Sequence, residues 1–428
     1  MPRAMQLPAE RGARRRVTVL NSVALNAGDA AILAGLRVAL LEAFGADLEL
    51  QVADDAPTAA SALYPDIDFF TGLHGSGLNA RHALRGATRS LHRRRVRIAQ
   101  LLLERAPAGG RALLDRRGRE HLARVGGSVA AISTGGTYFV EHYSFERRAL
   151  EVLAAISTGV PTFLYTQSLG PFTRRDTRHL MRRVLSGCAA VFLRDERSRQ
   201  HALELGVDEA RLHVRPDAAF VLSVPGPTLS TDRPLRIAVS VREWGHFSSG
   251  TRAEGTARYT EAVAATVRAL AREQDAQVTF MSTCQGVPAY WTDDSQFADR
   301  IVGELLRDVP GVHVDHAFRS PVALRDAYRE FDLVIATRMH AAILALCAGT
   351  PVVPIAYEFK TMELFRSLGM AELVDDIDHL SPESLVARVK RAVDERYLLR
   401  ARIAALLPQL REQAAEPAHR IRRLIEVA

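Results

Sequence analysis

The stretch IATRMHAAILALCAGTPVVPIAYEFK (335–360) contains the pattern that decides the fold. It starts with a short apolar run, continues as a helix of small residues, and ends in a second apolar run that Lys360 follows. Arg338 and His340 stand where the first run gives way to the helix. Strand–helix–strand alternation is typical of parallel sheets, whose strands present their carboxyl ends at one edge. The stretch therefore predicts that Arg338, His340 and Lys360 meet at that edge.

Short apolar runs, separated by longer helical patterns, recur along the chain and predict two parallel sheets. The predicted strands are 16–22, 48–52, 129–134, 161–167, 189–195 and 211–217 in the first half, and 236–242, 278–283, 312–316, 333–337 and 351–357 in the second. The segment SVPGPTLSTDRPL (223–235) between the two sets is rich in Pro, Ser and Thr, as linkers are. We expect an α/β protein with two Rossmann-like parallel-sheet domains that face a cleft, a GT-B-like arrangement in which ligands bind at the carboxyl ends of the strands.

These assignments divide the chain into four parts. The first residues contain no apolar segment of the kind that signal peptides have, so we interpret them as a disordered basic arm. The expected parts are the basic arm (1–16), the N-terminal α/β domain (17–225), the C-terminal α/β domain (236–400) and a charged helical tail (401–428). The first helix is predicted over 26–45, with Asp29 as its N-cap and Gly45 as its stop.

The segment 79–124 interrupts the alternation of strands and helices. It is helical in pattern, strongly basic, and broken by the sequence APAGG. One interpretation is a solvated arginine face, and the other is a basic amphipathic surface that touches anionic lipid. The sequence leaves both open.

Composition places the protein among ordinary globular chains. Of its 428 residues, 47% are hydrophobic and 25% charged, and the formal net charge of +7 favours anionic partners. Three distant cysteines without metal-type spacing indicate reduced thiols in a cytoplasmic protein, and no apolar run reaches the roughly 18 residues of a membrane span. We expect a cytoplasmic protein with possible peripheral contact to the membrane.

Several strand ends together resemble the polysaccharide pyruvyltransferase family. The matching segments are NAGDAAI (26–32), STGGTYFVE (133–141), SLGPF (168–172), RPDAAF (215–220), VSVRE (239–243) and TRMHAAILALCAGTPVVPIAYEFK (337–360). The segment STCQGVPAYWTDDS (282–295) is most similar to the colanic-acid type. The resemblance runs from about residue 17 to about residue 400, and Glu141 departs from it because an aspartate is expected there.

The resemblance implies a reaction with two substrates. Family members join the pyruvyl group of phosphoenolpyruvate to two hydroxyls of a sugar as a cyclic ketal. The implied acceptor is a sugar of an exopolysaccharide precursor, carried on a lipid at the cytoplasmic leaflet. Phosphoenolpyruvate is then a co-substrate, and no cofactor is implied.

Phosphoenolpyruvate carries a phosphate and a carboxylate, so its site needs several fixed cations. Arg338 and Arg242 at strand ends are the predicted anion ligands, because the arginine fork donates two parallel hydrogen bonds, and Lys360 adds a compact charge. His340 is the predicted general acid/base, because its charge can change near neutral pH. The non-catalytic alternatives are surface ion pairs for the arginines and a structural, helix-capping role for His340.

Further candidates for substrate binding stand at other strand ends. Asp217 and Glu243 are the alternative bases, and Tyr357 and Glu358 precede Lys360 in the same segment. In the N-terminal domain we expect sugar contacts from Asn26, Gly28 and Asp29, close backbone approach at Gly135 and Gly136, and stacking of Tyr290 or Trp291 on a sugar face.

Three rival functions differ in class from a pyruvyltransferase. A GT-B glycosyltransferase would share the architecture, but Arg366 stands eight positions after Glu358, where no second glutamate of the retaining pattern occurs. A non-catalytic scaffold is disfavoured by the intact set Arg338, His340 and Lys360. Nucleic-acid binding is disfavoured because the arginines are dispersed and no binding motif occurs, and no metal-ligand spacing is present.

Overall fold

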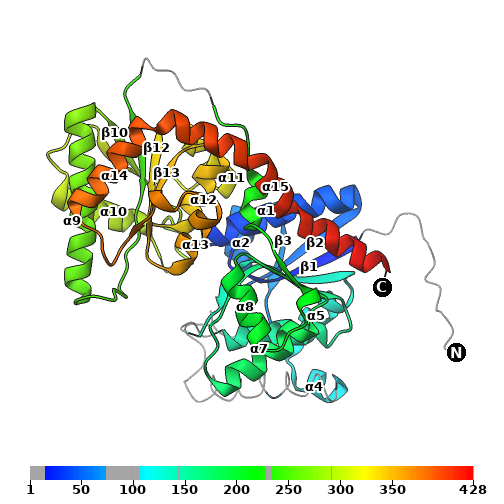
Figure 1. Cartoon of the computed structure of the whole chain (residues 1–428). Coiled ribbons are helices and arrows are strands. Elements are labelled where there is room, and N and C mark those ends of the chain that lie inside the picture. The colour runs from blue at the N-terminus through cyan, green and yellow to red at the C-terminus, as the bar shows by residue number, and fades with distance from the viewer. Residues whose placement is uncertain are drawn as a thin grey trace.

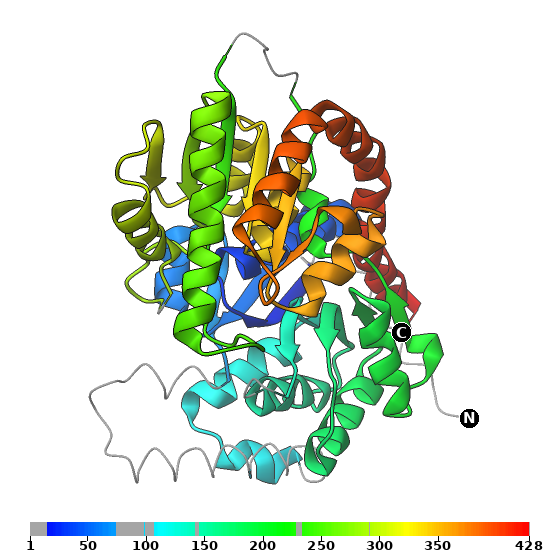
Figure 2. The same ribbon diagram turned by 60° about the vertical axis from the view of Figure 1, so that its left-hand side comes forward.

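The computed structural model describes residues 15–73, 98, 107–141, 145–227, 233–290 and 292–427. It shows two α/β domains, each built on a parallel sheet, which confirms the predicted fold class (Figures 1 and 2). The first sheet has the order β3-β2-β1-β4-β6-β7-β8, with β5 beside β6. Its strands are β1 (Arg15–Ser22), β2 (Leu48–Asp54), β3 (Asp68–Thr71), β4 (Ala130–Ser133), β5 (Gly136–Phe139), β6 (Thr162–Leu169), β7 (Ala190–Leu193) and β8 (Leu212–Val214).

The second sheet forms the core of the C-terminal domain. Its order is β11-β10-β9-β12-β13-β14, and its strands pair in parallel. The strands are β9 (Arg236–Ser240), β10 (Gln277–Met281), β11 (Val312–Asp315), β12 (Leu333–Ala336), β13 (Val352–Ala356) and β14 (Asp375–Asp376). Every residue of β12 and β13 is buried, as expected for strands covered by helices on both faces.

Helices cover both sheets. In the N-terminal domain they are α1 (Ala27–Phe44), η1 (Gly45–Asp47), α2 (Pro57–Leu63), α4 (Pro107–Leu113), α5 (Arg116–Gly126), α6 (Glu146–Ile156), α7 (Arg175–Gly187), α8 (Glu196–Glu204), η3 (Glu209–Arg211) and η4 (Ala218–Leu222). In the C-terminal domain they are α9 (Arg252–Gln274), α10 (Asp294–Leu305), α11 (Pro321–Tyr328), α12 (Met339–Cys347), α13 (Phe359–Ser367), η5 (Ala371–Leu373), α14 (Pro382–Asp394) and α15 (Arg396–Val427).

The structure differs from the expected elements in a few places. The N-cap of α1 is Asn26, not Asp29, because the Asn26 side chain accepts hydrogen bonds from the backbone N–H groups of Gly28 (2.9 Å) and Asp29 (3.4 Å). Gly45 ends the helix as predicted, with a φ of +73°. Arg15, assigned above to the basic arm, and Arg16, where the arm and the first predicted strand overlap, form the start of β1. The short strands β3, β5 and β14 were not predicted.

Parts of two predictions lie outside the described residues. Residues 1–14 of the expected arm and, except for residue 98, residues 79–106 of the basic segment belong to this part of the chain. The remainder of the basic segment forms α4 and most of α5. Among the helices that are described, none has the length and apolar character needed to cross a lipid bilayer.

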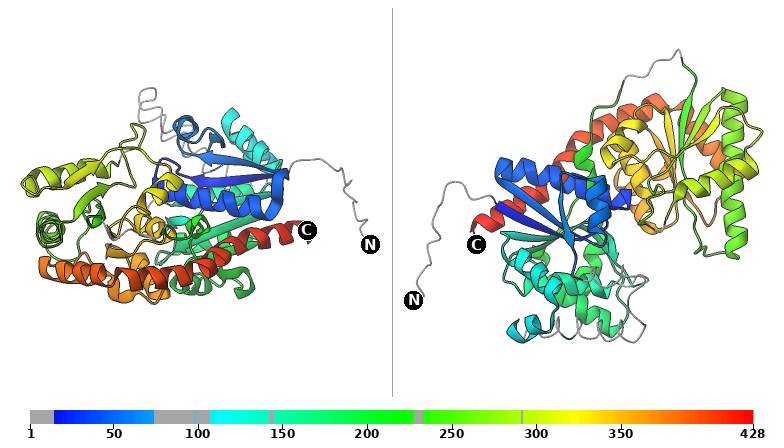
Figure 3. Two further views of the ribbon diagram at one scale, coloured as in Figure 1. Left: turned by 90° about the horizontal axis from the view of Figure 1, so that it is seen from above. Right: turned by 180° about the vertical axis from the view of Figure 1, so that it is seen from behind.

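Helix α15 links the end of the chain back to the N-terminal domain. Figure 3 shows it running from the C-terminal domain along the side of the other domain. Arg215 pairs with Glu416 at 3.0 Å, the Tyr165 hydroxyl donates to the carbonyl of Ala414 at 3.3 Å, and Arg411 pairs with Glu42. The predicted tail is therefore part of a helix that holds both domains together.

Helix α1 lies between the domains and packs against η4, α11, α12 and α15. Its closest approach is at Gly35, where a Cβ atom would lie 2.0 Å from the carbonyl oxygen of Ala218. Only glycine can occupy this position without moving the backbone of η4. One hydrophobic core, which includes Leu36, Phe220 and Ile343, therefore extends through both domains.

We expect Gly35→Ala to destabilise the protein by about 1–3 kcal/mol, because the added methyl forces two backbones apart. Gly303→Ala, also within a helix, is the matched control, since a Cβ there meets nothing within 4 Å. The control should stabilise by about 0.5–1 kcal/mol through its higher helix propensity. Urea unfolding followed by circular dichroism measures both changes, and equal stabilities of the two variants would contradict the tight approach.

His121 and Glu151 form a buried pair of titratable residues next to β3. The distance between His121 Nε2 and Glu151 Oε1 is 3.6 Å. Burial, with the nearby Asp55 charge, raises the pKa of Glu151 to about 7, although Glu151 accepts a hydrogen bond from the N–H of Leu73. Burial lowers the pKa of His121 to about 4. Both side chains are therefore uncharged at mildly acidic pH.

A raised carboxyl pKa means that the folded state keeps a proton which the unfolded chain has lost, so this contribution to stability declines as the pH rises from about 4.5 to about 7. Glu151→Gln removes the decline. We expect the stability of Glu151→Gln, relative to the unchanged protein, to increase by roughly 3 kcal/mol between pH 4.5 and pH 8. The opposite contribution of His121 is common to both proteins. Urea unfolding across this pH range tests the expectation, and a constant difference would contradict it.

Candidate active site

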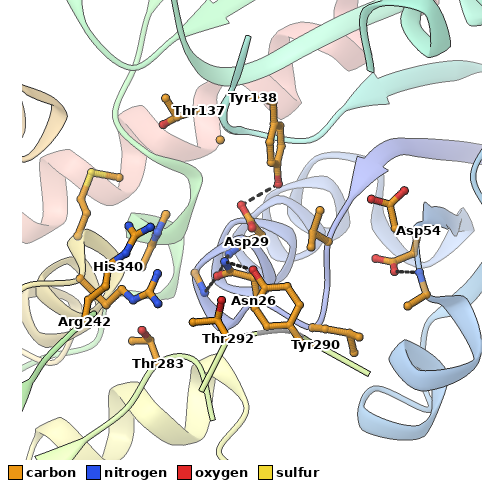
Figure 4. Close-up of a pocket in the computed structure, with 18 of the residues that line it drawn as sticks. Asn26, Asp29, Asp54, Thr137, Tyr138, Arg242, Thr283, Tyr290, Thr292 and His340 are labelled. Carbon is orange, nitrogen blue, oxygen red and sulfur yellow. Dashed lines mark hydrogen bonds between the residues drawn. The ribbon is translucent and has the colours of Figure 1, made fainter. Parts of the chain in front are cut away.

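A cavity of about 490 Å³ opens between the domains, at the carboxyl ends of the strands of both sheets. Figure 4 shows side chains from both domains pointing into it. The N-terminal domain contributes Asn26, Gly28, Asp29, Asp54, Asp55, Gly136, Thr137, Tyr138 and Arg148, and the C-terminal domain contributes Arg242, Thr283, Tyr290, Thr292, Arg338, Met339, His340, Tyr357 and Lys360. The cavity thus collects most of the predicted site residues.

The loop between β1 and α1 forms one wall and is held by Asp54. The Asp54 carboxylate accepts the backbone N–H groups of Ala24 and Ala56, each at 2.8 Å. Asn26, at the start of α1, donates from its side-chain amide to the hydroxyl of Tyr290 at 3.0 Å. This hydrogen bond joins the two domains across the cavity.

Asp29 lies in the first turn of α1 and accepts a hydrogen bond from the Tyr138 hydroxyl at 2.7 Å (Figure 4). Burial raises the pKa of Asp29, and this hydrogen bond with the charges of His340, Arg148 and Lys360 offsets only part of the effect. Burial and the neighbouring Asp29 also raise the pKa of Tyr138 well above its ordinary value. The phenol therefore keeps its proton and acts as a donor.

Arg148 packs against the ring of Tyr138. Its guanidinium lies 4.2 Å from the centre of the Tyr138 ring and donates to the backbone carbonyl of Asn21 at 2.8 Å. Asp55 is 3.4 Å away. Sequence reasoning missed Arg148, because nothing in its local sequence distinguishes it from the many other arginines of the chain.

Arg242 differs from the other predicted anion ligands. Its guanidinium lies over the rings of Tyr357 (4.4 Å) and Trp244 (5.2 Å). Within residues 15–73, 107–141, 145–227, 233–290 and 292–427, no carboxylate oxygen lies within 4 Å of it, so it makes no ion pair there. Aromatic faces position the cation while leaving its hydrogen-bond donors for a ligand.

Arg338 and Lys360 already have carboxylate partners. Arg338 donates to both oxygens of Asp294, at 2.8 and 2.6 Å, and the two side chains are 12% and 1% exposed. Lys360 Nζ is 2.5 Å from Glu358 and 3.4 Å from the Thr137 hydroxyl. Sequence reasoning assigned no catalytic or binding role to Asp294, and its neighbour Asp293 is the residue that caps α10.

His340 is the second residue of α12 and contacts α1. A Cβ on Gly28 would lie 2.6 Å from His340 Nδ1, so the glycine allows the imidazole to reach this helix. The other ring nitrogen, Nε2, lies 3.5 Å from Asp217. His340 is thus held between the first turn of α1 and a buried carboxylate.

Asp217 is ion-paired with Arg194 at 2.6 Å, and their side chains are 3% and 7% exposed. Burial alone would raise the pKa of Asp217, but Arg194 and His340 outweigh it and hold the pKa below its ordinary value. Arg194 also donates to the Thr137 hydroxyl at 2.8 Å. Sequence reasoning missed Arg194, although it stands at the carboxyl end of the predicted strand 189–195, a position that could have indicated it.

Four predicted residues lie outside the cavity wall. Asp217 and Glu358 stand behind it as partners of His340 and Lys360. Gly135 faces the protein interior, because a Cβ there would lie 2.6 Å from the Thr166 hydroxyl. Glu243 lies in a neighbouring depression, where it pairs with Arg252 (3.1 Å) and Arg300 (2.8 Å).

Two other expectations concerned the stacking aromatics and Glu141. Tyr290 lines the cavity, whereas Trp291 lies outside the described residues. Glu141, the departure from the family pattern, accepts the backbone N–H groups of Thr173 (2.8 Å) and Arg174 (3.0 Å) at the start of α7. It therefore anchors a helix and does not line the cavity. In the part of the chain that the structure describes, no cluster of three or more metal-ligating side chains occurs.

Solved structures share the fold. UDP-GlcNAc 2-epimerase from Neisseria meningitidis aligns with a TM-score of 0.56 at 10% identity, covering 95% of this chain and 99% of the epimerase. S. aureus MnaA aligns with a TM-score of 0.54 at 13% identity, covering 91% and 90%. The glycotransferase of kitacinnamycin aligns with a TM-score of 0.50 at 13% identity, covering 96% and 98%. Identities this low show the fold, a GT-B-like pair of domains, and nothing of the activity.

Sequence comparison is more specific. The amylovoran biosynthesis protein AmsJ of Erwinia amylovora is 26% identical over 298 residues, which cover 66% of this chain and 69% of AmsJ. The family model described as polysaccharide pyruvyl transferase matches residues 26–358, which is well over half of the chain and includes every cavity-lining residue except Val23, Leu25 and Lys360. The chain belongs to the polysaccharide pyruvyl transferase family.

Proposed function

We propose that the enzyme transfers the pyruvyl group of phosphoenolpyruvate to two hydroxyls of a sugar in an exopolysaccharide precursor, with release of phosphate. The observation that carries this proposal is the division of the cavity. Cations and His340 line its C-terminal wall, and polar groups suited to sugar hydroxyls line the opposite wall, around Asn26 and Asp29.

Arg242 is the main anchor for the anionic donor. Its charge has no carboxylate partner in the described chain, so an incoming phosphate or carboxylate does not have to displace one. Arg338 and Lys360 add donors to the same wall, but Asp294 and Glu358 offset their charges. Arg338 is therefore also structural, since its removal would leave Asp294 buried without a cation.

The chemistry requires one proton on the methylene carbon of phosphoenolpyruvate and the removal of a proton from each attacking hydroxyl. We assign the delivery of the first proton to His340. Asp217 holds Nε2 at 3.5 Å on the side away from the cavity, which leaves Nδ1, next to Gly28, for the substrate. Arg194 in turn fixes Asp217, so the imidazole is oriented by a buried ion pair.

The acceptor side is defined only by chemical class. Asn26, Tyr290 and Thr292 offer hydroxyl and amide groups to a sugar. The name of the relative AmsJ supports a role in exopolysaccharide biosynthesis. The colanic-acid subtype and a lipid-linked acceptor remain predictions from the sequence resemblance. A cytoplasmic location and peripheral membrane contact remain predictions from the cysteines and the basic segment.

We expect Arg242→Ala to weaken phosphoenolpyruvate binding about 10- to 100-fold, because it removes charge-assisted hydrogen bonds worth about 1.5–3 kcal/mol. Isothermal calorimetry with phosphoenolpyruvate, and in parallel with UDP- and GDP-sugars, measures the change. Arg252→Ala is the matched control, since Arg252 is exposed and pairs with Glu243 outside the cavity. Binding of a nucleotide-sugar but not of phosphoenolpyruvate by the unchanged protein would overturn the proposed function.

We expect His340→Gln to lower kcat by roughly 10²–10⁴-fold, the usual contribution of a general acid/base. Phosphate release from phosphoenolpyruvate in the presence of methyl galactoside, glucoside or mannoside is the readout. The affinity for phosphoenolpyruvate should stay within about threefold, since Arg242 is intact. Full activity of His340→Gln would remove His340 from the proton transfer.

A further inference from the structure

We infer that Asp29 is the general base that removes the proton from the attacking sugar hydroxyl. This inference rests on the proposed function and assigns a catalytic role to a residue that the sequence suggested only for capping or sugar binding. Three features of the structure carry it: the hydrogen bonding of Asp29, its position opposite His340, and the balance of protons in the reaction.

Asp29 differs from the other carboxylates in and around the cavity. The carboxylate of Asp54 accepts hydrogen bonds from two backbone N–H groups, and the carboxylate of Asp55 pairs with Arg148. Behind the wall, Asp294 and Asp217 are paired with arginines. Asp29 has one hydroxyl donor, Tyr138, and across the described ranges no basic nitrogen lies within 4 Å of its carboxylate. A base must have a lone pair that no cation occupies, and Asp29 meets this condition.

The position of Asp29 places it on the acceptor wall, facing His340. Gly28, its neighbour in the chain, is the residue against which the His340 imidazole packs. Figure 4 shows the Asp29 side chain directed into the cavity, with His340 and Arg242 on the opposite side and Tyr138 bonded to it. A sugar hydroxyl that approaches an enol phosphate held by Arg242 therefore passes close to Asp29.

The proton balance closes with these two residues. In the first step the sugar oxygen bonds to C2 of phosphoenolpyruvate, Asp29 takes the hydroxyl proton, and His340 gives its proton to C3, which becomes a methyl group. In the second step the second sugar oxygen bonds to C2 and the C2–O bond to phosphate breaks. Asp29 returns its proton to the leaving phosphate, while His340 takes the proton of the second hydroxyl. Both residues end in their starting states, and no further reactant is needed.

The environment of Asp29 suits a base. Burial raises its pKa, which makes the carboxylate a stronger proton acceptor than an exposed aspartate, and the Tyr138 hydrogen bond lowers the pKa again in part. The activity should therefore show an acidic limb that reports Asp29. Because Tyr138 stabilises the charged carboxylate, Tyr138→Phe should move this limb to higher pH.

The test compares Asp29→Asn with the unchanged enzyme in the phosphate-release assay, with each of the three methyl glycosides and with water alone as the nucleophile. Asparagine keeps the shape and can still bind a hydroxyl, but it cannot accept the proton. We expect kcat to fall by about 10²–10⁴-fold, the acidic limb to disappear, and KM for the glycoside and Kd for phosphoenolpyruvate to stay within about threefold. Asp47→Asn, the same change at an exposed residue just beyond α1, is the matched control.

The outcomes separate the inference from the proposed function. If Asp29→Asn raises KM but keeps kcat and the acidic limb, Asp29 only binds the sugar and the inference is overturned. If the unchanged enzyme neither binds phosphoenolpyruvate nor releases phosphate from it, the proposed function itself fails. Thermal melting identifies a variant that does not fold. In that case Asp29→Glu, which keeps a displaced base, should retain the acidic limb at a lower kcat, and loss of the limb in this folded variant would overturn the inference.

Discussion

Helix α1 has to pack against both domains at once, and the geometry of the active site depends on this constraint. Its middle reaches the backbone of η4 at Gly35, where the Ala218 carbonyl leaves no room for a side chain. Its first turn carries Asn26, Gly28 and Asp29 to the cavity. A shift of α1 would move all three relative to His340. Helix α15, which crosses from one domain to the other, holds the same arrangement from outside (Figure 1).

Charge compensation is the second organising feature of the site. Buried cations are costly unless a carboxylate accompanies them, and the structure supplies Asp294 for Arg338, Asp217 for Arg194 and Glu358 for Lys360. These pairs fix the shape of the cation-rich wall. Three charged residues that line the cavity, Arg242, Asp29 and Asp54, have no opposite charge within 4 Å in the described chain, and Asp54 is held by two backbone N–H groups. That leaves Arg242 and Asp29. The first suits an anionic substrate, and the second suits proton transfer.

Sequence patterns predicted most of the fold, because parallel strands covered on both faces are continuous apolar runs that are easy to recognise. β12 and β13 are examples. The strands β3, β5 and β14 are too short and too mixed in character to give such a signal. The N-cap of α1 was misplaced from Asn26 to Asp29, since both residue types are good caps and only the hydrogen bonds distinguish them.

By itself, the sequence determined the α/β class, the two-domain organisation and the family, and it placed Arg242, Arg338, His340 and Lys360 at strand ends, because these properties follow from local periodicity and motif. Which charges meet was decided by the tertiary structure. The partners of Arg338 and His340 are 44 and 123 positions away along the chain, at Asp294 and Asp217, and Asp29 faces His340 from the other domain. Such pairings arise only when the two sheets close on one another, since electrostatic interactions depend on distance in space and not on distance along the chain.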